Sequence, residues 1–259
     1  MEITMERIYI RGVGFDNVSP DEALERCESM IVESRAEGAP AHRIHTPNAE
    51  IVQMCVEDPK KRELINSADL IVPDGAGVIL AGKILKAPMP KGKVAGVELL
   101  EGLIRNSGKN GRKIFLLGGK PDAGNGKSVA ETAKEKLLEK YPDALIVGTH
   151  DGYFKDDAAV IEEINAADAD VLAVCLGVPK QEEWMYAHRN DLHVGVMGGF
   201  GGSLDVFAGT VSRAPKFFIK MNLEWFYRFI KQPTRLGRMM KIPKFVFGSI
   251  KDRIIKKKY

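Results

Sequence analysis

The sequence predicts a Rossmann-like α/β fold, in which helices cover both faces of a mainly parallel sheet. Short apolar runs alternate with longer amphipathic stretches along most of the chain. Several strand-like runs end in a polar or glycine-rich turn, which is typical of the loops that join parallel strands to helices. The chain has 259 residues, of which 44% are hydrophobic and 28% charged, so it can bury a full core.

The predicted strands are short, apolar and bounded by turn residues. In chain order they are Arg7–Arg11, Ala41–His45, Leu70–Pro73, Lys113–Leu117, Leu145–Val147, Val171–Leu176 and Val194–Met197.

Helix start and stop signals lie between these strands. Ser19-Pro20-Asp21-Glu22 has the form of a capping box with proline at the first helical position, and Gly38 is placed to end that helix. Asp58-Pro59 opens another helix, and the two prolines of Lys86–Lys93 predict a loop. Further helices are predicted after Asn48, over Ala76–Leu85, Gly96–Ser107, Gly126–Tyr141 and Asp157–Ala167, and after Gln181.

The last part of the chain is chemically distinct from the rest. Residues 209–259 contain 14 Lys and Arg against 2 acidic residues, which leaves 24 basic and 33 acidic residues for the other 208. The same segment holds 9 of the 19 aromatic residues. We therefore predict a catalytic core over residues 1–208 and a helical appendage over residues 209–259, punctuated by Pro215, Pro233 and Pro243.

The composition of the appendage favours a membrane surface as its partner. Basic and aromatic residues together suit anionic lipid, and they also suit nucleic acid, but the number of aromatic residues exceeds what phosphate contact needs. A third reading is a helix that packs on the core and exposes a basic face. We expect a peripheral cytoplasmic protein that binds no nucleic acid. The sequence does not determine its oligomeric state, although exposed apolar faces on an undocked appendage would favour self-association in solution.

The cysteines and the N-terminal region support this compartment. Cys27, Cys55 and Cys175 each lie in an apolar pattern, with no spacing typical of a disulfide framework or a metal site. Met1–Arg11 lacks the apolar run of a signal peptide, and no segment has the ~20 apolar residues that span a bilayer.

Loops that follow the predicted strands indicate where a ligand would bind. The carboxyl ends of parallel strands meet at one edge of the sheet, and glycines there let backbone N–H groups approach phosphate oxygens. Tight strand-to-helix turns are the alternative explanation of the same glycines. The loops are Thr46-Pro47-Asn48, Asp74-Gly75, Gly118-Gly119, Gly177 to Gln181 and Gly198–Gly202.

Asp74 is the candidate catalytic carboxylate of this edge. It directly follows the strand Leu70–Pro73 and precedes the helix Ala76–Leu85. An aspartate at such a junction most often caps the following helix. The two roles, helix cap and general base, remain alternatives at this point.

Two phosphate-binding motifs fail on inspection. Gly126-Lys127-Ser128 lacks the glycine that a P-loop needs five positions earlier, where Pro121 stands. Gly199-Phe200-Gly201 lacks the third glycine of a dinucleotide fingerprint, since position 204 is leucine. An ATPase or a dehydrogenase is therefore poorly supported.

No metal site is predicted. Asp168 and Asp170 precede the strand Val171–Leu176, so they belong to the opposite edge of the sheet. The five histidines show no ligand spacing. We expect a protein without a metal or other cofactor.

Several motifs together resemble the WecG/TagA/CpsF glycosyltransferases, over nearly the whole chain. They are Thr46-Pro47-Asn48, Pro73-Asp74-Gly75, Asp151-Gly152-Tyr153-Phe154, Leu176 to Glu182, the run Gly198 to Gly209, Arg213-Ala214-Pro215 and Glu224 to Arg228. The glycine-rich run joined to Arg-Ala-Pro is the most specific of them.

The resemblance implies a reaction at the membrane. N-acetylmannosamine would pass with inversion from its UDP donor to the 4-hydroxyl of N-acetylglucosamine on undecaprenyl diphosphate, giving a β-1,4 linkage in wall teichoic acid or a related envelope polymer. Two alternatives remain: a family member that uses N-acetylmannosaminuronic acid or glucose, and a non-catalytic module that binds a nucleotide sugar or a membrane.

The resemblance also implies roles for individual residues. Asp74 matches the general base, with Thr46 and Asn48 as polar neighbours, and three arginines of the appendage would complete the site over the diphosphate. The donor would contact residues of several loops. The arginines are Arg228, Arg235 and Arg238, and the donor residues are Lys93, Gly118, Gly119, Tyr153, Gln181, Gly198, Gly199, Gly201 and Asp205.

One position departs from the family pattern. Where many members have arginine in the loop before the Val-Ala/Thr-Gly turn, this chain has Lys93. Lysine keeps the positive charge but lacks the bidentate guanidinium fork, so the resemblance assigns its role less firmly.

Overall fold

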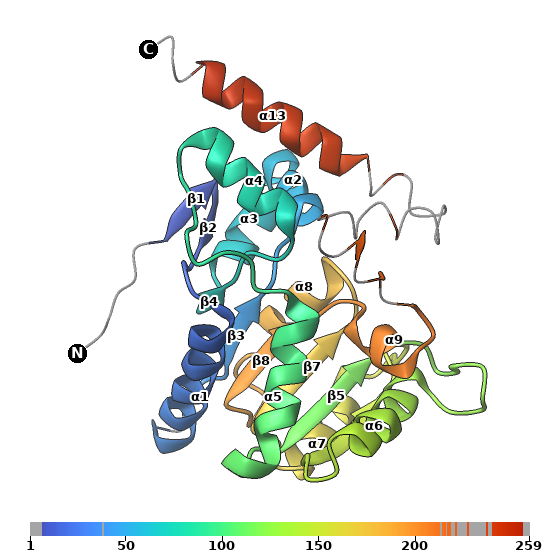
Figure 1. The fold of residues 1–259 in the computed structure, drawn as a ribbon. Helices are drawn as coiled ribbons and strands as arrows, with labels where there is room; N and C mark the ends of the chain where they lie inside the picture. The colour runs from blue at the N-terminus through green and yellow to red at the C-terminus, as the bar shows by residue number, and fades with distance from the viewer. Residues whose placement is uncertain are drawn as a thin grey trace.

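The structure is a computed structural model that describes residues 7–37, 39–212, 214–215, 217–218, 221, 227, 237 and 240–255. Its centre is a six-stranded sheet in the order β4-β3-β8-β7-β5-β6, and every neighbouring pair is parallel (Figure 1). The strands are β3 (His42–His45), β4 (Leu70–Ile71), β5 (Ile114–Gly118), β6 (Ile146–His150), β7 (Val171–Cys175) and β8 (Val196–Gly199). The predicted Rossmann-like α/β fold is confirmed.

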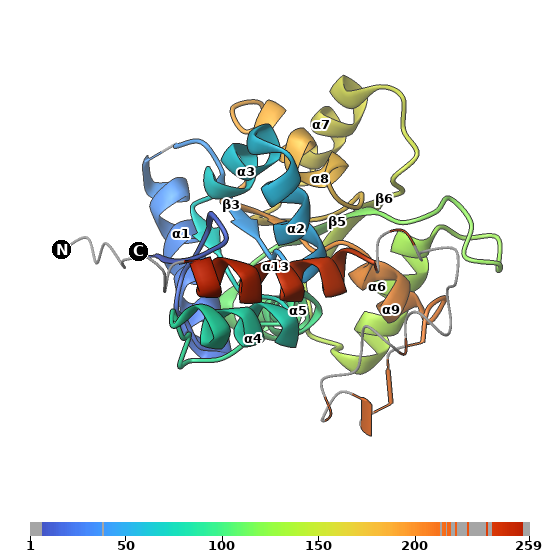
Figure 2. The same ribbon diagram turned by 90° about the horizontal axis from the view of Figure 1, so that it is seen from above.

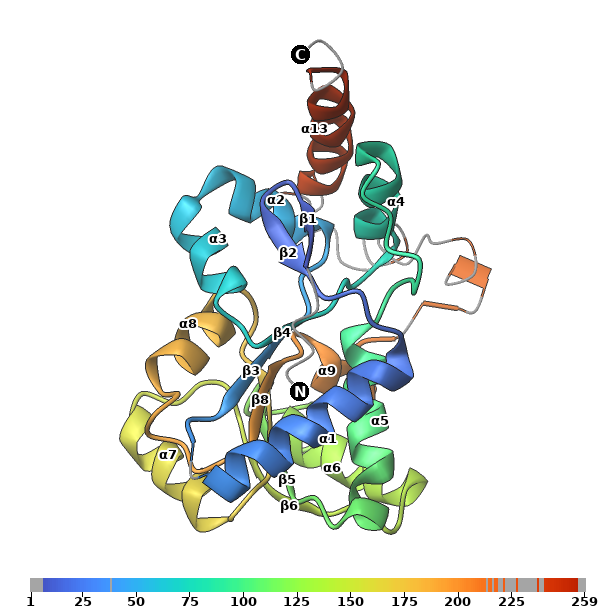
Figure 3. The same ribbon diagram turned by 90° about the vertical axis from the view of Figure 1, so that its left-hand side faces the viewer.

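Helices cover both faces of this sheet (Figure 3). Successive residues of a strand point to opposite faces, so neighbours on β5 enter different cores. Leu116 packs with the helices of one face and Phe115 with those of the other. The first face carries α1 (Pro20–Glu37), α5 (Gly96–Asn110), α6 (Val129–Lys140) and α9 (Ser203–Ala208), and the second carries α7 (Asp157–Ala166) and α8 (Lys180–Ala187).

A third apolar core forms a separate lobe beside β3 and β4. The first predicted strand belongs to this lobe and not to the parallel sheet, because β1 (Ile8–Ile10) pairs antiparallel with β2 (Val13–Phe15). The sequence analysis did not predict β2, whose three residues are too few for a clear pattern. The hairpin packs with α2 (Ala49–Glu57), α3 (Pro59–Asn66), α4 (Ala76–Leu85) and α13 (Lys241–Ile255).

The C-terminal helix α13 is part of this lobe. Viewed from above, it lies along the line between α2 and α4 (Figure 2). The Phe245 side chain is fully buried, and Arg11 Nε lies 2.8 Å from Asp252 Oδ2. Pro243 does not interrupt the helix, contrary to the expected punctuation, because a proline is tolerated in the first turn. The boundary at residue 209 stays a prediction, but α13 shares its core with N-terminal elements.

Local signals correctly placed the starts of α1 and α3. Ser19 and Glu22 exchange hydrogen bonds as a capping box. Ser128 and Glu131 also form a capping box, before α6, which the sequence analysis did not identify. The helix predicted from Gly126 begins later, at Val129, because the preceding residues form a turn around Asp122 Oδ1. The predicted stop signal Gly38 lies outside the described residues.

Candidate active site

The predicted loops do meet at the carboxyl edge of the sheet. The arrowheads of β5 and β7 in Figure 1 point to this edge. Hydrogen bonds connect the loops in pairs: Asp74 N–H donates to the Pro47 carbonyl (3.3 Å), and Gly152 N–H donates to the Gly119 carbonyl (2.8 Å). The strand ends therefore form one continuous surface, as expected from the parallel order.

Asp74 is not the N-cap residue of the helix that follows it. The N-cap of α4 is Gly75, with φ of 86° and no side chain to cap the helix. The interpretation of Asp74 as the N-cap residue is therefore wrong. The Asp74 side chain is half-buried at the edge of the sheet, in contact with other groups.

The loop that carries Lys93 joins the Asp74 loop. Val94 N–H donates to the Pro73 carbonyl at 2.9 Å, which places the two loops side by side. Lys93 is half-buried and makes an interaction of its own. A cation and a carboxylate thus lie on adjoining loops of the same edge.

Thr46 and Asn48 both have structural roles in this edge. Thr46 Oγ1 donates to the Gly199 carbonyl at 3.0 Å, so it ties the end of β3 to the end of β8. Asn48 is the N-cap of α2, and its Oδ1 accepts from the backbone N–H groups of Glu50 and Ile51. The hydrogen bonds of both side chains therefore stabilise the loop that precedes α2.

Close packing explains most of the predicted phosphate-binding glycines. Gly198 and Gly199 belong to strand β8, and a Cβ on Gly198 would lie 2.3 Å from the Phe200 ring. A Cβ on Gly118 would lie 2.4 Å from the Cys175 carbonyl oxygen, and one on Gly119 would lie 2.6 Å from Val129 Cβ. Close packing therefore accounts for Gly118, Gly119 and Gly198 without a ligand, and Gly198 and Gly199 lie in a strand rather than in a tight turn.

Gly201 differs from these four glycines. Its φ is +55°, and nothing lies within 4 Å of the place where a Cβ would stand. Its N–H donates to Gln181 Oε1 at 3.0 Å. The open space beside its Cα is where a ligand can approach the backbone of this loop.

Tyr153 and Asp205 flank the β7 and β8 ends. The loop after β6 folds back toward α8, since Lys180 Nζ donates to the Gly152 carbonyl at 3.2 Å, and the adjacent Tyr153 is 66% exposed. Asp205 is half-buried in α9 and accepts from Thr210 Oγ1 at 3.3 Å. An exposed ring and a carboxylate are suited to stacking on a base and binding a hydroxyl.

Several predicted residues lie outside the described part of the chain. Arg228, Arg235 and Arg238 belong to this group, and so do Arg213 and the segment 222–226. Their proposed roles over a diphosphate remain predictions.

Asp168 and Asp170, which the sequence analysis rejected as metal ligands, form ion pairs with basic side chains. Asp168 pairs with Lys113 at 2.8 Å and with Arg35 at 3.2 Å, and the hydrogen bond from Lys113 contributes most to lowering its pKa. Asp170 pairs with Arg35 at 3.0 Å. No group of three or more His, Cys, Asp or Glu among the described residues could hold a metal ion.

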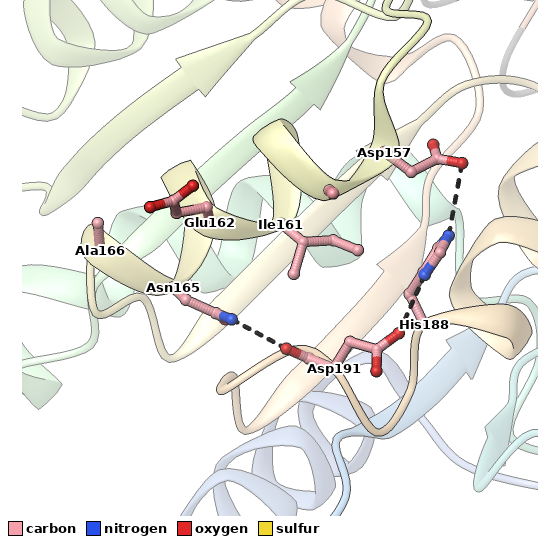
Figure 4. A pocket seen from close by; sticks show the side chains of 8 residues that line it. Asp157, Ile161, Glu162, Asn165, Ala166, His188 and Asp191 are labelled. Carbon is pink, nitrogen blue, oxygen red and sulfur yellow. Dashed lines mark hydrogen bonds and ion pairs between the residues drawn. The ribbon is translucent and has the colours of Figure 1, made fainter.

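A surface hollow lies between α7 and the segment after α8 (Figure 4). His188 stands between two carboxylates, with Nδ1 at 3.2 Å from Asp191 and Nε2 at 3.7 Å from Asp157. Asn165 Nδ2 donates to the Asp191 carbonyl. The hollow contains none of the predicted site residues, so it does not mark the candidate site.

In the part of the chain that the structure describes, no helix is long and apolar enough to cross a bilayer.

Comparisons with known proteins are consistent along the whole chain. Residues 8–259 match the model of the Glycosyl transferase WecG/TagA/CpsF family. Three similar relatives come from Staphylococcus aureus strains MW2, MRSA252 and NCTC 8325 / PS 47. Each is 36% identical over 253 residues, covering 97% of this chain and 95% of the relative, and each is an N-acetylglucosaminyldiphosphoundecaprenol N-acetyl-beta-D-mannosaminyltransferase.

Proposed function

Because this chain belongs to the WecG/TagA/CpsF family of glycosyltransferases, we propose that it transfers N-acetylmannosamine from UDP-N-acetylmannosamine to N-acetylglucosamine on undecaprenyl diphosphate. The names of the relatives support this choice of donor sugar and acceptor. The product would enter wall teichoic acid or a related envelope polymer. No metal or other cofactor is required in this proposal.

Asp74 is the proposed general base. Its carboxylate takes the proton from the acceptor 4-hydroxyl, the freed oxygen attacks the anomeric carbon, and the bond from that carbon to UDP breaks. Attack from the side opposite UDP inverts the anomeric centre and gives the β-1,4 linkage. The observation that supports this assignment is the place of Asp74: it is half-buried at the carboxyl edge of the sheet, and Gly75, not Asp74, is the N-cap residue of α4.

Negative charge develops on the leaving diphosphate and needs cationic partners. Guanidinium groups serve well because they bind phosphate oxygens through two parallel N–H bonds. We propose Arg228, Arg235 and Arg238 for this role, with Lys93 as a further cation beside Asp74. Arg235→Ala should lower transfer at least tenfold while leaving the melting temperature unchanged, and a large drop in melting temperature would favour a packing role.

The outward face of α13 supports binding to a membrane surface. Phe247 is 71% exposed and Ile254 is 55% exposed, and they alternate along the helix with the exposed lysines Lys244 and Lys251. Apolar side chains flanked by lysines suit the headgroup region of an anionic bilayer. The lipid-linked acceptor would then be presented where the appendage docks, on the cytoplasmic face.

Vesicle binding tests this docking. The double variant Phe247→Ser and Ile254→Ser should sediment less with anionic phospholipid vesicles and keep its melting temperature, since both side chains are exposed. Val32→Ser on α1 is the matched control, because Val32 is 53% exposed on another helix. Equal sedimentation of all three proteins would remove the role of α13.

A transfer assay tests the proposed function directly. The protein is incubated with candidate UDP sugars and a short-chain lipid diphosphate that carries N-acetylglucosamine. Product from UDP-N-acetylmannosamine is the expected result. Product from UDP-N-acetylmannosaminuronic acid or UDP-glucose alone would change the donor, and UDP binding without any transfer would favour a non-catalytic module.

A further inference from the structure

A carboxyl group is buried directly beside the candidate donor site. Glu182 stands in the first turn of α8 and is only 2% exposed. Its Oε1 accepts from Gln181 Nε2 at 2.8 Å, whereas Oε2 is buried without a hydrogen-bond partner among the described residues. A buried carboxyl with one unpaired oxygen is costly, so its retention calls for a specific role.

The Gln181 amide links this carboxyl to the glycine-rich loop. Gln181 is also 2% exposed, and its Oε1 accepts from Gly201 N–H at 3.0 Å. The amide could in principle be rotated by half a turn, but Nε2 would then face the Gly201 N–H, and two donors would oppose each other. In the observed orientation, Glu182 Oε1 accepts from the amide nitrogen, which leaves the amide oxygen of Gln181 facing the Gly201 N–H. Glu182 thus favours the orientation of Gln181 that holds Gly201.

The held loop has open space beside Gly201, where nothing lies within 4 Å of the place of a Cβ. Thr46 fixes the Gly199 carbonyl from one side, and Gln181 fixes the Gly201 N–H from the other. A turn pinned at both ends presents its remaining backbone groups in one arrangement, which lowers the cost of ordering it around a ligand.

We propose that Glu182 is a positioning residue, which acts through the Gln181 amide to hold the Gly201 turn in the form that receives the nucleotide sugar. This inference rests on the proposed transferase function, because it assigns Glu182 to the donor side of that site. Glu182 touches no substrate, and its effect reaches the donor only through Gln181 and the loop.

The protonation state of Glu182 adds a signature that a plain packing role would lack. Burial raises its pKa to about 7, with Glu183 on the same helix acting in the same direction, while the bond from Gln181 and the backbone N–H of Glu182 oppose the shift. From α2, the Cys55 thiol faces it and stays neutral, with its own pKa raised to about 12. Asp58, Lys61 and Arg62 lie around Cys55.

Ionisation would place an unpaired charge in this buried position. Water must then enter the start of α8 to solvate Oε2, which loosens the contact between Gln181 and the loop. Transfer should therefore fall as the pH rises through about 7.

Two substitutions of Glu182 separate positioning from packing. Glu182→Leu keeps the volume but removes the acceptor, so the KM for the UDP sugar should rise about tenfold with a smaller change in kcat. Its melting temperature should not fall, because an unpaired carboxyl is removed. Glu182→Gln keeps an acceptor oxygen and cannot ionise. Its KM at pH 6 should therefore equal that of the wild type, and its transfer activity should not decline above pH 7.

Hydrogen exchange gives a readout that does not depend on turnover. Peptides over residues 198–206 should exchange faster in Glu182→Leu and Gln181→Leu, and the double variant should be no faster than either. The control is Glu183→Leu, since Glu183 is exposed on the same helix and should leave both KM and exchange unchanged.

Unchanged KM and exchange in a stable Glu182→Leu protein would overturn the proposal. A joint loss of melting temperature and affinity in both Glu182→Leu and Glu182→Gln would also overturn it, because it would show a packing role. If the wild-type protein transfers no sugar, the proposed function fails, while the exchange rates still decide whether Glu182 positions the loop.

Discussion

The two sides of the carboxyl edge hold their residues in different ways. On the β4 side, backbone hydrogen bonds join the loops of Asp74 and Lys93 to their neighbours, and both side chains remain half-buried. On the β8 and β7 side, Thr46 and Gln181 are themselves buried and bind backbone groups of the glycine-rich loop. The motif residues are therefore of two kinds, half-buried side chains such as Asp74 and buried side chains that hold the loops.

The largest expected effect on transfer activity comes from the β4 side of the edge. Asp74→Asn keeps the size of the side chain but removes the base, so transfer should fall by about 10²-fold or more. UDP binding and the melting temperature should change little, because asparagine keeps a side-chain oxygen that accepts hydrogen bonds and Asp74 is not the N-cap residue of α4. Near-normal turnover by this variant would place Asp74 among the residues that hold the loops.

The pH dependence of stability tests the buried side. The pKa of Glu182 is about 7 in the folded protein against an ordinary value of 4.5, so the folded state binds this proton more tightly than the unfolded state. Its stabilising contribution is full below about pH 4.5 and is lost as the pH rises through 7, up to roughly 3 kcal/mol. Urea unfolding at pH 5 and pH 8 should show this loss in the wild type and in Glu183→Gln, but not in Glu182→Gln. If the free energy of unfolding changed equally between pH 5 and pH 8 in the wild type, Glu183→Gln and Glu182→Gln, the raised pKa of Glu182 would be contradicted.

Thr46 provides a smaller test of the same side. Thr46→Val is nearly isosteric, but it removes the hydroxyl that donates to the Gly199 carbonyl. The free energy of unfolding should fall by about 1–2 kcal/mol, because a buried carbonyl loses its partner. Turnover per folded molecule should fall less than in Asp74→Asn. The reverse ranking would make Thr46 a residue that contacts the substrate.

Gly201 gives the smallest expected change in stability. Alanine there meets no atom within 4 Å but must adopt a φ of +55°, which costs about 1 kcal/mol. Because the added methyl group enters the open space beside the loop, UDP-sugar affinity should fall more than stability does. Calorimetric titration with UDP beside urea unfolding makes this comparison, and unchanged affinity would show that no ligand occupies that space.

Local signals in the sequence were sufficient for most of the fold. Capping boxes such as Ser19 with Glu22 depend only on neighbouring residues, so they placed helix starts correctly. Burial on both faces makes parallel strands such as β5 continuously apolar, so the sheet was also visible. The hairpin β1–β2 could not be predicted from the sequence. The antiparallel pairing of two three-residue strands is decided by contacts with α4 and α3, which are distant in the chain.

The candidate site divides along the same line. Asp74, Thr46 and Gln181 could be picked from their motifs, whereas Glu182 could not. An acidic residue in the first turn of a helix ordinarily serves the helix dipole in solvent, and nothing in its neighbours reveals that this one is buried. Gly198 and Gly199 were predicted to bind phosphate from their motif, but glycine is needed there because a Cβ would collide with Phe200 and with Gln181.

By itself, the amino-acid sequence determined the alternation of strands and helices, the edge at which chemistry is expected and the family. These depend on periodicity, turn residues and motifs, which are local properties of the chain. The tertiary structure decided which of the motif residues are buried, how α13 joins the N-terminal lobe and what Gln181 faces. Burial and hydrogen-bond direction depend on segments brought together from distant parts of the chain, and a linear pattern does not contain that information.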